Sequence, residues 1–270
     1  MASHRIIIGV DGSPGARTAL NWAVDECRLR ACTLLVVHAL DTRDVRPVVS
    51  SRSGGGYDDP IDRLLNDLAA VASARQPGVP VTTMLSGKRP ADALIGLSAD
   101  AQLLVVGTRG RNGFAGTMLG SVSHRTAAHA QCAVAIIPLD HHPVEYGRHG
   151  VVVGASDGRA GRLALEFARH EADIRGTTLR VVRAEDDPVE TLLDEAHAAQ
   201  LLVLGCHHSA DRWATRLGPV PTAILPRSPC PVIVVGAGHD TVDGTADGLT
   251  DCVAVPGALG ELQPAKSIPQ

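Results

Sequence analysis

The stretch AQLLVVGTRGRNGFAGTMLGS, residues 101–121, places five glycines directly after a run of apolar residues. A short apolar run bounded by glycine is typical of a buried strand, whereas a simple turn needs only one or two glycines. We therefore predict a strand over 102–107, followed by a loop whose bare main chain approaches a ligand. The rest of the sequence indicates where this loop lies in the fold.

The composition restricts the class of protein. Of the 270 residues, 44% are apolar but only 2% are aromatic, so we expect an aliphatic core of parallel strands between alanine-rich helices. The net charge of −4 gives no basic field for nucleic acid. No apolar run approaches the ~18 residues that span a bilayer, and the N-terminus lacks the apolar segment of a signal peptide. We expect a cytoplasmic protein with reduced thiols and no nucleic-acid or membrane partner.

The chain contains a duplication that has lost one segment. Residues 20–39 match 165–184 at an offset of 145 residues. Nearer the C-terminus, AQLLVVGTRG at 101–110 matches AQLLVLGCHH at 199–208, where the offset is only 98. The fall in offset means that the second copy lacks the equivalent of roughly 41–87.

Alternating strands and helices are predicted in both copies, and such alternation indicates a parallel sheet with right-handed crossovers. The first copy is expected to hold strands at 5–10, 33–40, 79–86, 102–107 and 133–138, and helices at 14–31, 59–75, 90–99 and 120–131. The second copy is expected to hold strands at 151–155, 178–184, 200–205 and 231–236, and helices at 159–175, 187–199 and 217–226. Its missing piece corresponds to the helix at 59–75 and the strand at 79–86, and a strand at the sheet edge can be lost without dividing the sheet.

Four segments follow from these assignments. They are a first domain at 1–140, a linker at 141–150, a shortened second domain at 151–236, and a largely disordered tail at 237–270 that lacks periodicity. Cys132 and Cys230 stand just before the matching last strands. If those strands pair antiparallel, the two cysteines lie at opposite ends of the pair, so we expect no disulfide between them.

The glycine loop does not carry the two common phosphate-binding motifs. A Walker A loop needs GxxxxGK followed by Ser or Thr, and the dinucleotide fingerprint is GxGxxG; neither string occurs. What remains is Gly107-x2-Gly110-x9-Gly120-Ser121. Gly107 ends the strand, and Gly110 permits the positive φ that lets successive N–H groups point at one anion. Gly120 and Ser121 begin a helix whose free N–H groups attract phosphate.

Asp11 is expected beside this loop. In an open α/β sheet, ligands bind beyond the carboxyl ends of the strands, where the strand order reverses, and Asp11 follows the first strand. A carboxylate at that place suits a ribose hydroxyl or a bridging Mg²⁺. Ser121 and Ser123 would add hydroxyl donors, and Arg109 would add positive charge.

These features together resemble the universal stress protein family. The segments IIIGVDGS, LLVVHAL and LLVVGTRGRNGFAGTMLGSVSHRTAAHAQCAVAIIP match its pattern, including a Gly-x2-Gly-x9-Gly-Ser/Thr motif. The resemblance covers 4–139 fully and 151–236 in degraded form. It implies an α/β fold of two doubly wound parallel sheets, with strand order 3-2-1-4-5 in the first domain and a reduced 2-1-4-5 in the second. It also implies pairing through strand 5 as an intramolecular pseudo-dimer, with a homodimer as a further option.

Carried over by position, the resemblance implies ATP, with or without Mg²⁺, at the carboxyl edge of the first domain. Asp11 would be the contact to Mg²⁺, and the main chain of Ala39 would meet adenine. The full set comprises Val10, Asp11, Ser13 and Ala39 toward the nucleoside, and Gly107, Arg109, Gly110, Gly120, Ser121, Val122 and Ser123 toward the phosphates.

The second copy has lost this motif. Its loop GCHHSADRWATRLGPVP keeps Gly205, but His208 replaces the second glycine and Pro219 replaces the serine. Ser156 stands at the position of Asp11. These three losses predict that the second domain binds no ATP. No group of residues in either copy has convincing metal-ligand spacing.

Three functions are compatible with this pattern. We expect a nucleotide-dependent stress regulator that is not an enzyme, with ATP in the first domain and an unidentified protein partner. A weak ATPase is an alternative, although no spare His or Glu stands near the loop as a general base. The other alternative is a scaffold or interaction protein without catalytic activity.

Overall fold

The computed structural model describes residues 4–40, 60–108, 110, 119–141, 149–183, 186–206 and 217–236. The described elements lie close to the predicted ones. In the first half they are β1 Arg5–Val10, α1 Pro14–Leu29, β2 Thr33–Ala39, α2 Pro60–Arg75, β3 Val81–Ser86, α3 Pro90–Leu97, a 3₁₀ turn Ser98–Asp100, β4 Leu103–Gly107, α4 Ser121–His129 and β5 Ala133–Ile137. In the second half they are β6 His149–Gly154, α5 Arg159–Arg175, β7 Leu179–Val182, α6 Pro188–Ala196, β8 Ala199–Cys206, α7 Pro219–Ile224 and β9 Val232–Gly236.

Two predicted segments differ from the structure or fall outside it. Strand β6 begins at His149, inside the predicted linker at 141–150. The predicted tail at 237–270 lies outside the described residues. Within the described ranges, every helix is too short or too polar to span a bilayer.

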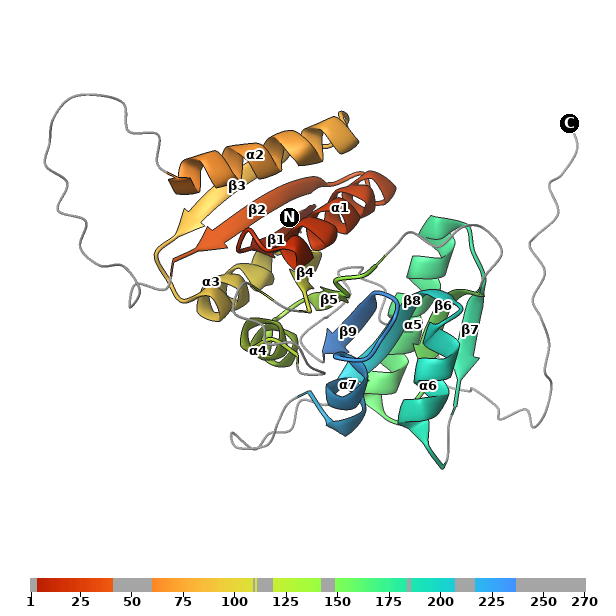
Figure 1. Ribbon diagram of the computed structural model, residues 1–270. Coiled ribbons are helices and arrows are strands. Elements are labelled where there is room, and N and C mark those ends of the chain that lie inside the picture. The colour runs from red at the N-terminus through yellow and green to blue at the C-terminus, as the bar shows by residue number, and fades with distance from the viewer. Residues whose placement is uncertain are drawn as a thin grey trace, which may run out of the picture. The chain divides into compact units, whose positions relative to one another are not determined.

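The described strands form one sheet in the order β3-β2-β1-β4-β5-β9-β8-β6-β7 (Figure 1). Read by halves, this gives 3-2-1-4-5 for the first copy and 2-1-4-5 for the second, so the predicted orders are confirmed. Neighbouring strands within each half are parallel, whereas β5 and β9 pair antiparallel. The two copies are therefore joined through their last strands, as predicted.

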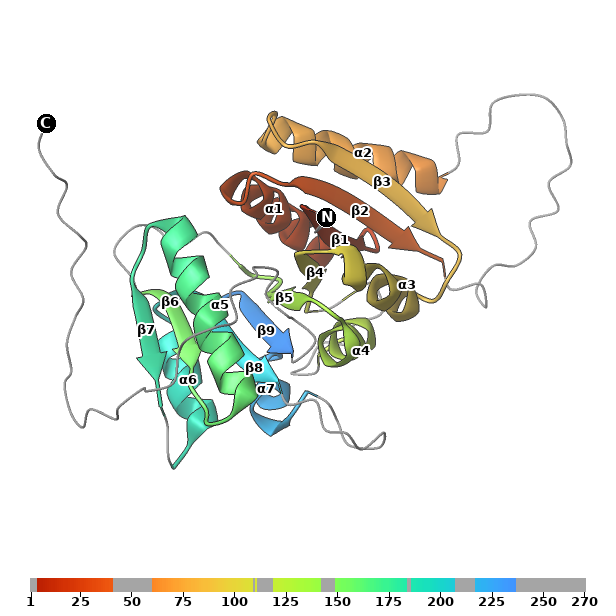
Figure 2. The ribbon, with the colours of Figure 1, turned by 180° about the vertical axis from the view of Figure 1, so that it is seen from behind.

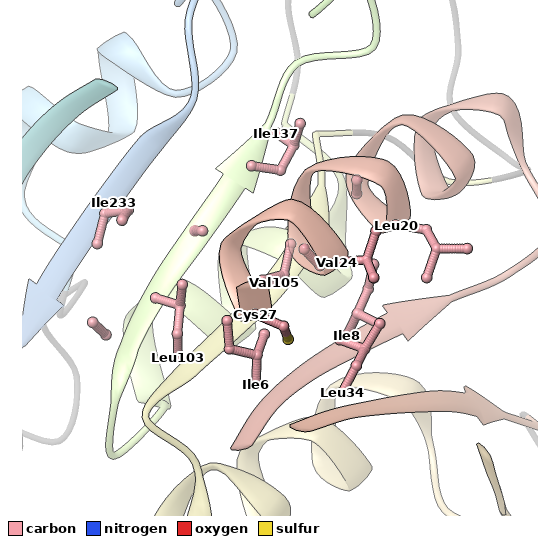
Figure 3. Close-up of a cluster of buried hydrophobic side chains, with 14 of the residues drawn as sticks. Ile6, Ile8, Leu20, Val24, Cys27, Leu34, Leu103, Val105, Ile137 and Ile233 are labelled. Atoms are coloured by element: carbon pink, nitrogen blue, oxygen red, sulfur yellow. The ribbon is translucent and has the colours of Figure 1, made fainter. Parts of the chain in front are cut away.

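Helices cover both faces of the sheet and enclose two aliphatic cores (Figures 1 and 2). Residues of α1, α2 and α5 pack into one core, and residues of α3, α4, α6 and α7 pack into the other. Each core takes residues from both copies. Figure 3 shows Ile137 of β5 and Ile233 of β9 in the same cluster as Ile6 and Ile8 of β1.

The cysteines beside the central strand pair are free. Cys132 and Cys230 are buried without a disulfide, in agreement with the sequence-based expectation. Burial raises the pKa of the Cys132 thiol to about 12. It raises the pKa of the Cys230 thiol to about 11. Both thiols are therefore protonated near neutral pH and are poor nucleophiles.

The missing segment leaves β7, the edge strand of the second half, more exposed than its counterpart β2. Val36 in β2 is fully buried, whereas the equivalent Val181 in β7 is 48% exposed. In the first half, α2 packs on β2, and β3 pairs with its outer edge. The second half has no counterpart of these two elements in its described residues, so β7 keeps an open edge and an uncovered face.

The ends of α1 and α5 show how the duplication shaped the backbone. Ala31 follows α1 with a φ of 49°, and the equivalent Gly176 follows α5 with a φ of 59°. Equivalent hydrogen bonds close the two helix ends. The N–H of Cys32 donates to the Cys27 carbonyl over 3.0 Å, and the N–H of Thr177 donates to the Ala172 carbonyl over 3.0 Å. Ala31 thus adopts a left-handed conformation that glycine adopts without strain.

We predict that Ala31→Gly raises the free energy of unfolding by about 0.5–1 kcal/mol, because it removes left-handed strain from an exposed position. Gly176→Ala is the matched variant and should lower stability by a similar amount, since nothing lies within 4 Å of the added methyl and only the backbone conformation changes. Urea unfolding of both variants checks the pair. Destabilisation by Ala31→Gly would show that the left-handed conformation of Ala31 carries no strain that glycine relieves.

Candidate functional site

The carboxyl ends of three parallel strands define one edge of the first half. Val10, Ala39 and Gly107 are the last residues of β1, β2 and β4. From β1 the chain proceeds outward to β2 and β3, and then returns to β4 on the other side of β1. The strand order therefore reverses between β1 and β4, which is where open α/β sheets bind ligands.

A tight turn between β1 and α1 holds Asp11. Its Oδ1 accepts a hydrogen bond of 3.0 Å from the N–H of Ser13. Gly12 between them has a φ of 81°, a conformation that glycine adopts without strain. The Ser13 hydroxyl accepts a bond of 3.2 Å from the N–H of Ala16 and so caps α1. The turn and the helix cap together fix the carboxylate at the strand end.

Asp11 and Gly110 meet across the reversal point. A methyl group built on Gly110 would lie 2.4 Å from Oδ2 of Asp11, far inside van der Waals contact. The structure thus brings the carboxylate after β1 against the glycine loop after β4. It also supplies a reason for glycine at position 110, because a side chain there would have to displace this carboxylate.

The start of α4 is anchored to the end of β4. The Ser123 hydroxyl is buried and donates a 2.7 Å hydrogen bond to the Gly107 carbonyl. The N–H of Gly120 donates over 2.9 Å to the Thr108 carbonyl. Gly120 forms the N-cap with extended backbone and without a side-chain cap bond.

These bonds change which groups can face a ligand. Gly120 has its N–H engaged within the protein, and the Ser123 hydroxyl is also engaged. The first-turn N–H groups of Ser121, Val122 and Ser123 remain the donors that the helix presents. Ser121 is exposed and Val122 is half-buried. Arg109 lies outside the described residues.

Sequence reasoning missed His38, which lies at the same edge. This residue is 6% exposed, and its Nδ1 is 2.8 Å from the carbonyl oxygen of Val10. Because a carbonyl oxygen can only accept, Nδ1 carries the hydrogen. His38 therefore ties the end of β2 to the end of β1. A single histidine within the apolar run LLVVHA was the available signal.

The arrangement can bind an anion that also carries hydroxyl groups. Uncapped N–H groups at a helix N-terminus attract phosphate, and the neighbouring Asp11 carboxylate can accept from a hydroxyl. Among the residues that the structure describes, no group of three His, Cys, Asp or Glu could hold a metal ion. A Mg²⁺ ion at Asp11 would therefore take further ligands from phosphate oxygens or water.

The corresponding edge of the second half is built differently. A methyl group on Gly205 would lie 2.5 Å from the carbonyl oxygen of Ala160, so the first turn of α5 packs against the end of β8. Helix α7 begins Pro219-Val220-Pro221, in register with Ser121-Val122-Ser123. Proline has no N–H, so two of the three first-turn donors are missing. Sequence reasoning noted only the first of these prolines.

Comparison with known proteins assigns both halves of the chain to one family. The family model for the universal stress protein family matches residues 2–138 and 146–236. The chain belongs to this family. Universal stress protein Rv1996 of Mycobacterium tuberculosis (strain ATCC 25618 / H37Rv) is 25% identical over 308 residues, which covers 87% of this chain and 96% of that protein.

Solved structures of the family share the fold. The crystal structure of a universal stress protein from Archaeoglobus fulgidus DSM 4304 superposes with a TM-score of 0.67 at 18% identity, covering 86% of this chain and 96% of that one. A universal stress protein crystallised in complex with cAMP is 25% identical over 52% of this chain and 100% of its own, with a TM-score of 0.41.

We predict that Ser123→Ala lowers the free energy of unfolding by about 1–2 kcal/mol, because the hydrogen bond from the buried Ser123 hydroxyl to the Gly107 carbonyl is lost. Ser121→Ala is the matched control: this serine lies on the same turn but is exposed, so its loss should change stability by less than about 0.5 kcal/mol. Denaturant unfolding measures both. Equal effects of the two variants would show that the Ser123 bond does not anchor α4.

Proposed function

We propose that the first half binds one adenine nucleotide, ATP, between the end of β1 and the start of α4, and that the chain acts as a nucleotide-dependent stress regulator. The observation that carries this proposal is the contact of Asp11 with Gly110 beside an uncapped helix N-terminus. It combines a group suited to a sugar hydroxyl with donors suited to phosphate at one reversal point.

The described geometry supports a division of roles among the residues. The N–H groups of Ser121, Val122 and Ser123 would hold phosphate oxygens, with the exposed Ser121 hydroxyl as a further donor. Asp11 would accept from a ribose hydroxyl or bind Mg²⁺, which would neutralise phosphate charge. The main chain of Ala39, at the end of the neighbouring strand β2, would contact adenine.

Nucleotide would bind to the first half alone. In the second half, Pro219 and Pro221 remove two helix donors. Ser156 replaces the carboxylate. The second half would instead serve as a structural partner and as part of the surface that another protein reads.

We further propose that the nucleotide is a signal and not a substrate. The side chains nearest the reversal point already have structural tasks, since Asp11 accepts from the Ser13 N–H and Ser123 donates to Gly107. Hydrolysis or phosphoryl transfer commonly requires a further residue that accepts a proton or orients the attacking water. Incubation with ATP and chromatography of the products tests this proposal: release of ADP above the buffer rate, abolished by Asp11→Asn, would establish the weak ATPase instead.

We predict that isothermal titration calorimetry with ATP gives one site per chain and that Asp11→Asn weakens binding at least about tenfold. The asparagine can still accept from the Ser13 N–H, so the turn should persist while the negative charge is lost. Gly110→Ala should weaken binding as well, because its methyl group displaces the carboxylate.

Asp157→Asn is the matched control, since this exposed carboxylate follows the first strand of the second half. It should leave affinity unchanged. Mass spectrometry of the supernatant after heat denaturation tests whether nucleotide accompanies the purified protein. Absence of heat at millimolar ATP, or two sites per chain, would contradict the proposal; in the first case a scaffold function would be favoured.

A further inference from the structure

Two buried glutamates and two arginines whose side chains are 7% and 10% exposed form a closed ring at the ends of α1 and α5. Glu26 and Glu171 are 2% and 0% exposed. Nε of Arg30, the residue that follows α1, donates to Glu26 over 2.8 Å, and Arg175 is paired with Glu171 on α5. Nη2 of Arg175 donates across the interface to Glu26 over 2.5 Å, and Arg30 donates across it to Glu171. Each carboxylate therefore contacts one arginine from each half.

The ring follows the symmetry of the duplication. The offset of 145 residues converts Glu26 into Glu171 and Arg30 into Arg175, so each half contributes the same pair at the same helical positions. The two crossing bonds are consequently equivalent to each other. Such an interface is isologous: the same surface of each half meets its own counterpart.

The ladder between β5 and β9 obeys the same pseudo-twofold relation. Ala135 pairs with Ile233, and these are equivalent positions at the offset of 98 residues. The axis passes between them, and the flanking pairs Val134–Val234 and Ile136–Val232 are equivalent to each other. Ring and ladder are thus two contacts of one symmetric interface.

The ladder by itself specifies its register weakly. The strands read AVAII and VIVVG, and every residue of both is buried. Where one face of a strand is polar, a slip exposes apolar side chains, but here both faces of both strands are apolar. A slip of two residues, about 6.6 Å along the strand, would exchange one small or branched aliphatic side chain for another.

We infer that the Glu26–Arg30–Glu171–Arg175 ring fixes the register and orientation in which the two halves pair. A slip of one strand position carries the guanidinium groups beyond hydrogen-bonding distance of their carboxylates. It would leave four charges buried without partners, which is strongly unfavourable. The motif Glu-x3-Arg also fixes the relative direction of the two helices. When the helices run antiparallel, each glutamate lies opposite an arginine, whereas parallel helices would place like charges opposite each other. The ring is therefore a specificity element of the interface.

Stability alone is a weaker account of this ring. Removing four charges from water costs free energy that their mutual attraction offsets only in part, and apolar residues of similar volume often replace such rings without loss. Arg30 also lies 5.8 Å from the centre of the Phe167 ring, which adds a second contact across the same interface. Buried polar groups that set register are known from other helix pairs.

The test uses the full chain and reverses the charges of one helix. In Glu26→Arg/Arg30→Glu, the pair within α1 persists but both crossing contacts become like-charged. We expect the amides of 133–137 and 232–236 to exchange with deuterium at least about 100-fold faster, while the β1–β2 amides keep their protection. Adding Glu171→Arg/Arg175→Glu restores opposite charges with unchanged composition and should recover protection to within about tenfold. Unchanged exchange in the first variant, or no recovery in the second, would overturn the inference.

A second variant separates register from stability. Replacing all four ring residues by methionine should leave a folded chain, because the volume is kept and no charge is buried. We expect NMR contacts for more than one β5–β9 register, with weakened Val134–Val234 contacts. A methionine variant that keeps only the native contacts would show that the apolar ladder sets the register and would overturn the inference.

Discussion

The antiparallel contact between β5 and β9 is the constraint on which the remaining structure depends. Each of these strands ends the parallel sheet of its own half, and each is buried along its whole length. Separated, both would expose an apolar face and an unpaired backbone edge, which invites association with other chains. Joined, they convert two small sheets into one and allow both aliphatic cores to continue from one half into the other. A half without its partner would lack one wall of each core.

This constraint explains why the second half keeps its interface residues but differs from the first half elsewhere. The second half still supplies β9, α5 and its share of both cores, and these elements keep the apolar residues that the interface needs. The carboxyl ends of its strands and its edge strand β7 take no part in this interface, so the interface does not constrain their residues. Prolines now begin α7, and the equivalents of α2 and β3 are absent from its described residues. Packing at the centre is thus maintained in both halves, whereas a full set of first-turn N–H donors beside a strand-end carboxylate is present only in the described residues of the first half.

Much of the fold was predictable because periodicity and glycine placement are local signals. The repeat offsets gave the matching strands of the two halves and the missing segment, the family resemblance supplied the strand order, and the glycine loop located the reversal point. The ring was not predicted, although Glu26 and Glu171 align in the matching segments, because helical periodicity does not reveal which polar position another helix will cover. The bonds of Gly120 and Ser123 were missed for a related reason. The sequence shows which donors exist, but their partners, the carbonyls of Thr108 and Gly107, depend on how α4 docks.

The contact of Asp11 with Gly110 shows that the second glycine of the motif is under a steric constraint as well as a conformational one. Gly110 is small because the carboxylate of a neighbouring strand occupies the space that a side chain would need. The two positions are therefore coupled, and a change at one alters the requirement at the other. The second half bears this out in its sequence: Ser156 stands for Asp11, and His208 stands for Gly110. Once the carboxylate is absent, the steric reason for glycine is absent too. The second half thus lacks both members of this contact, and its helix α7 begins with prolines in place of residues that offer first-turn N–H groups.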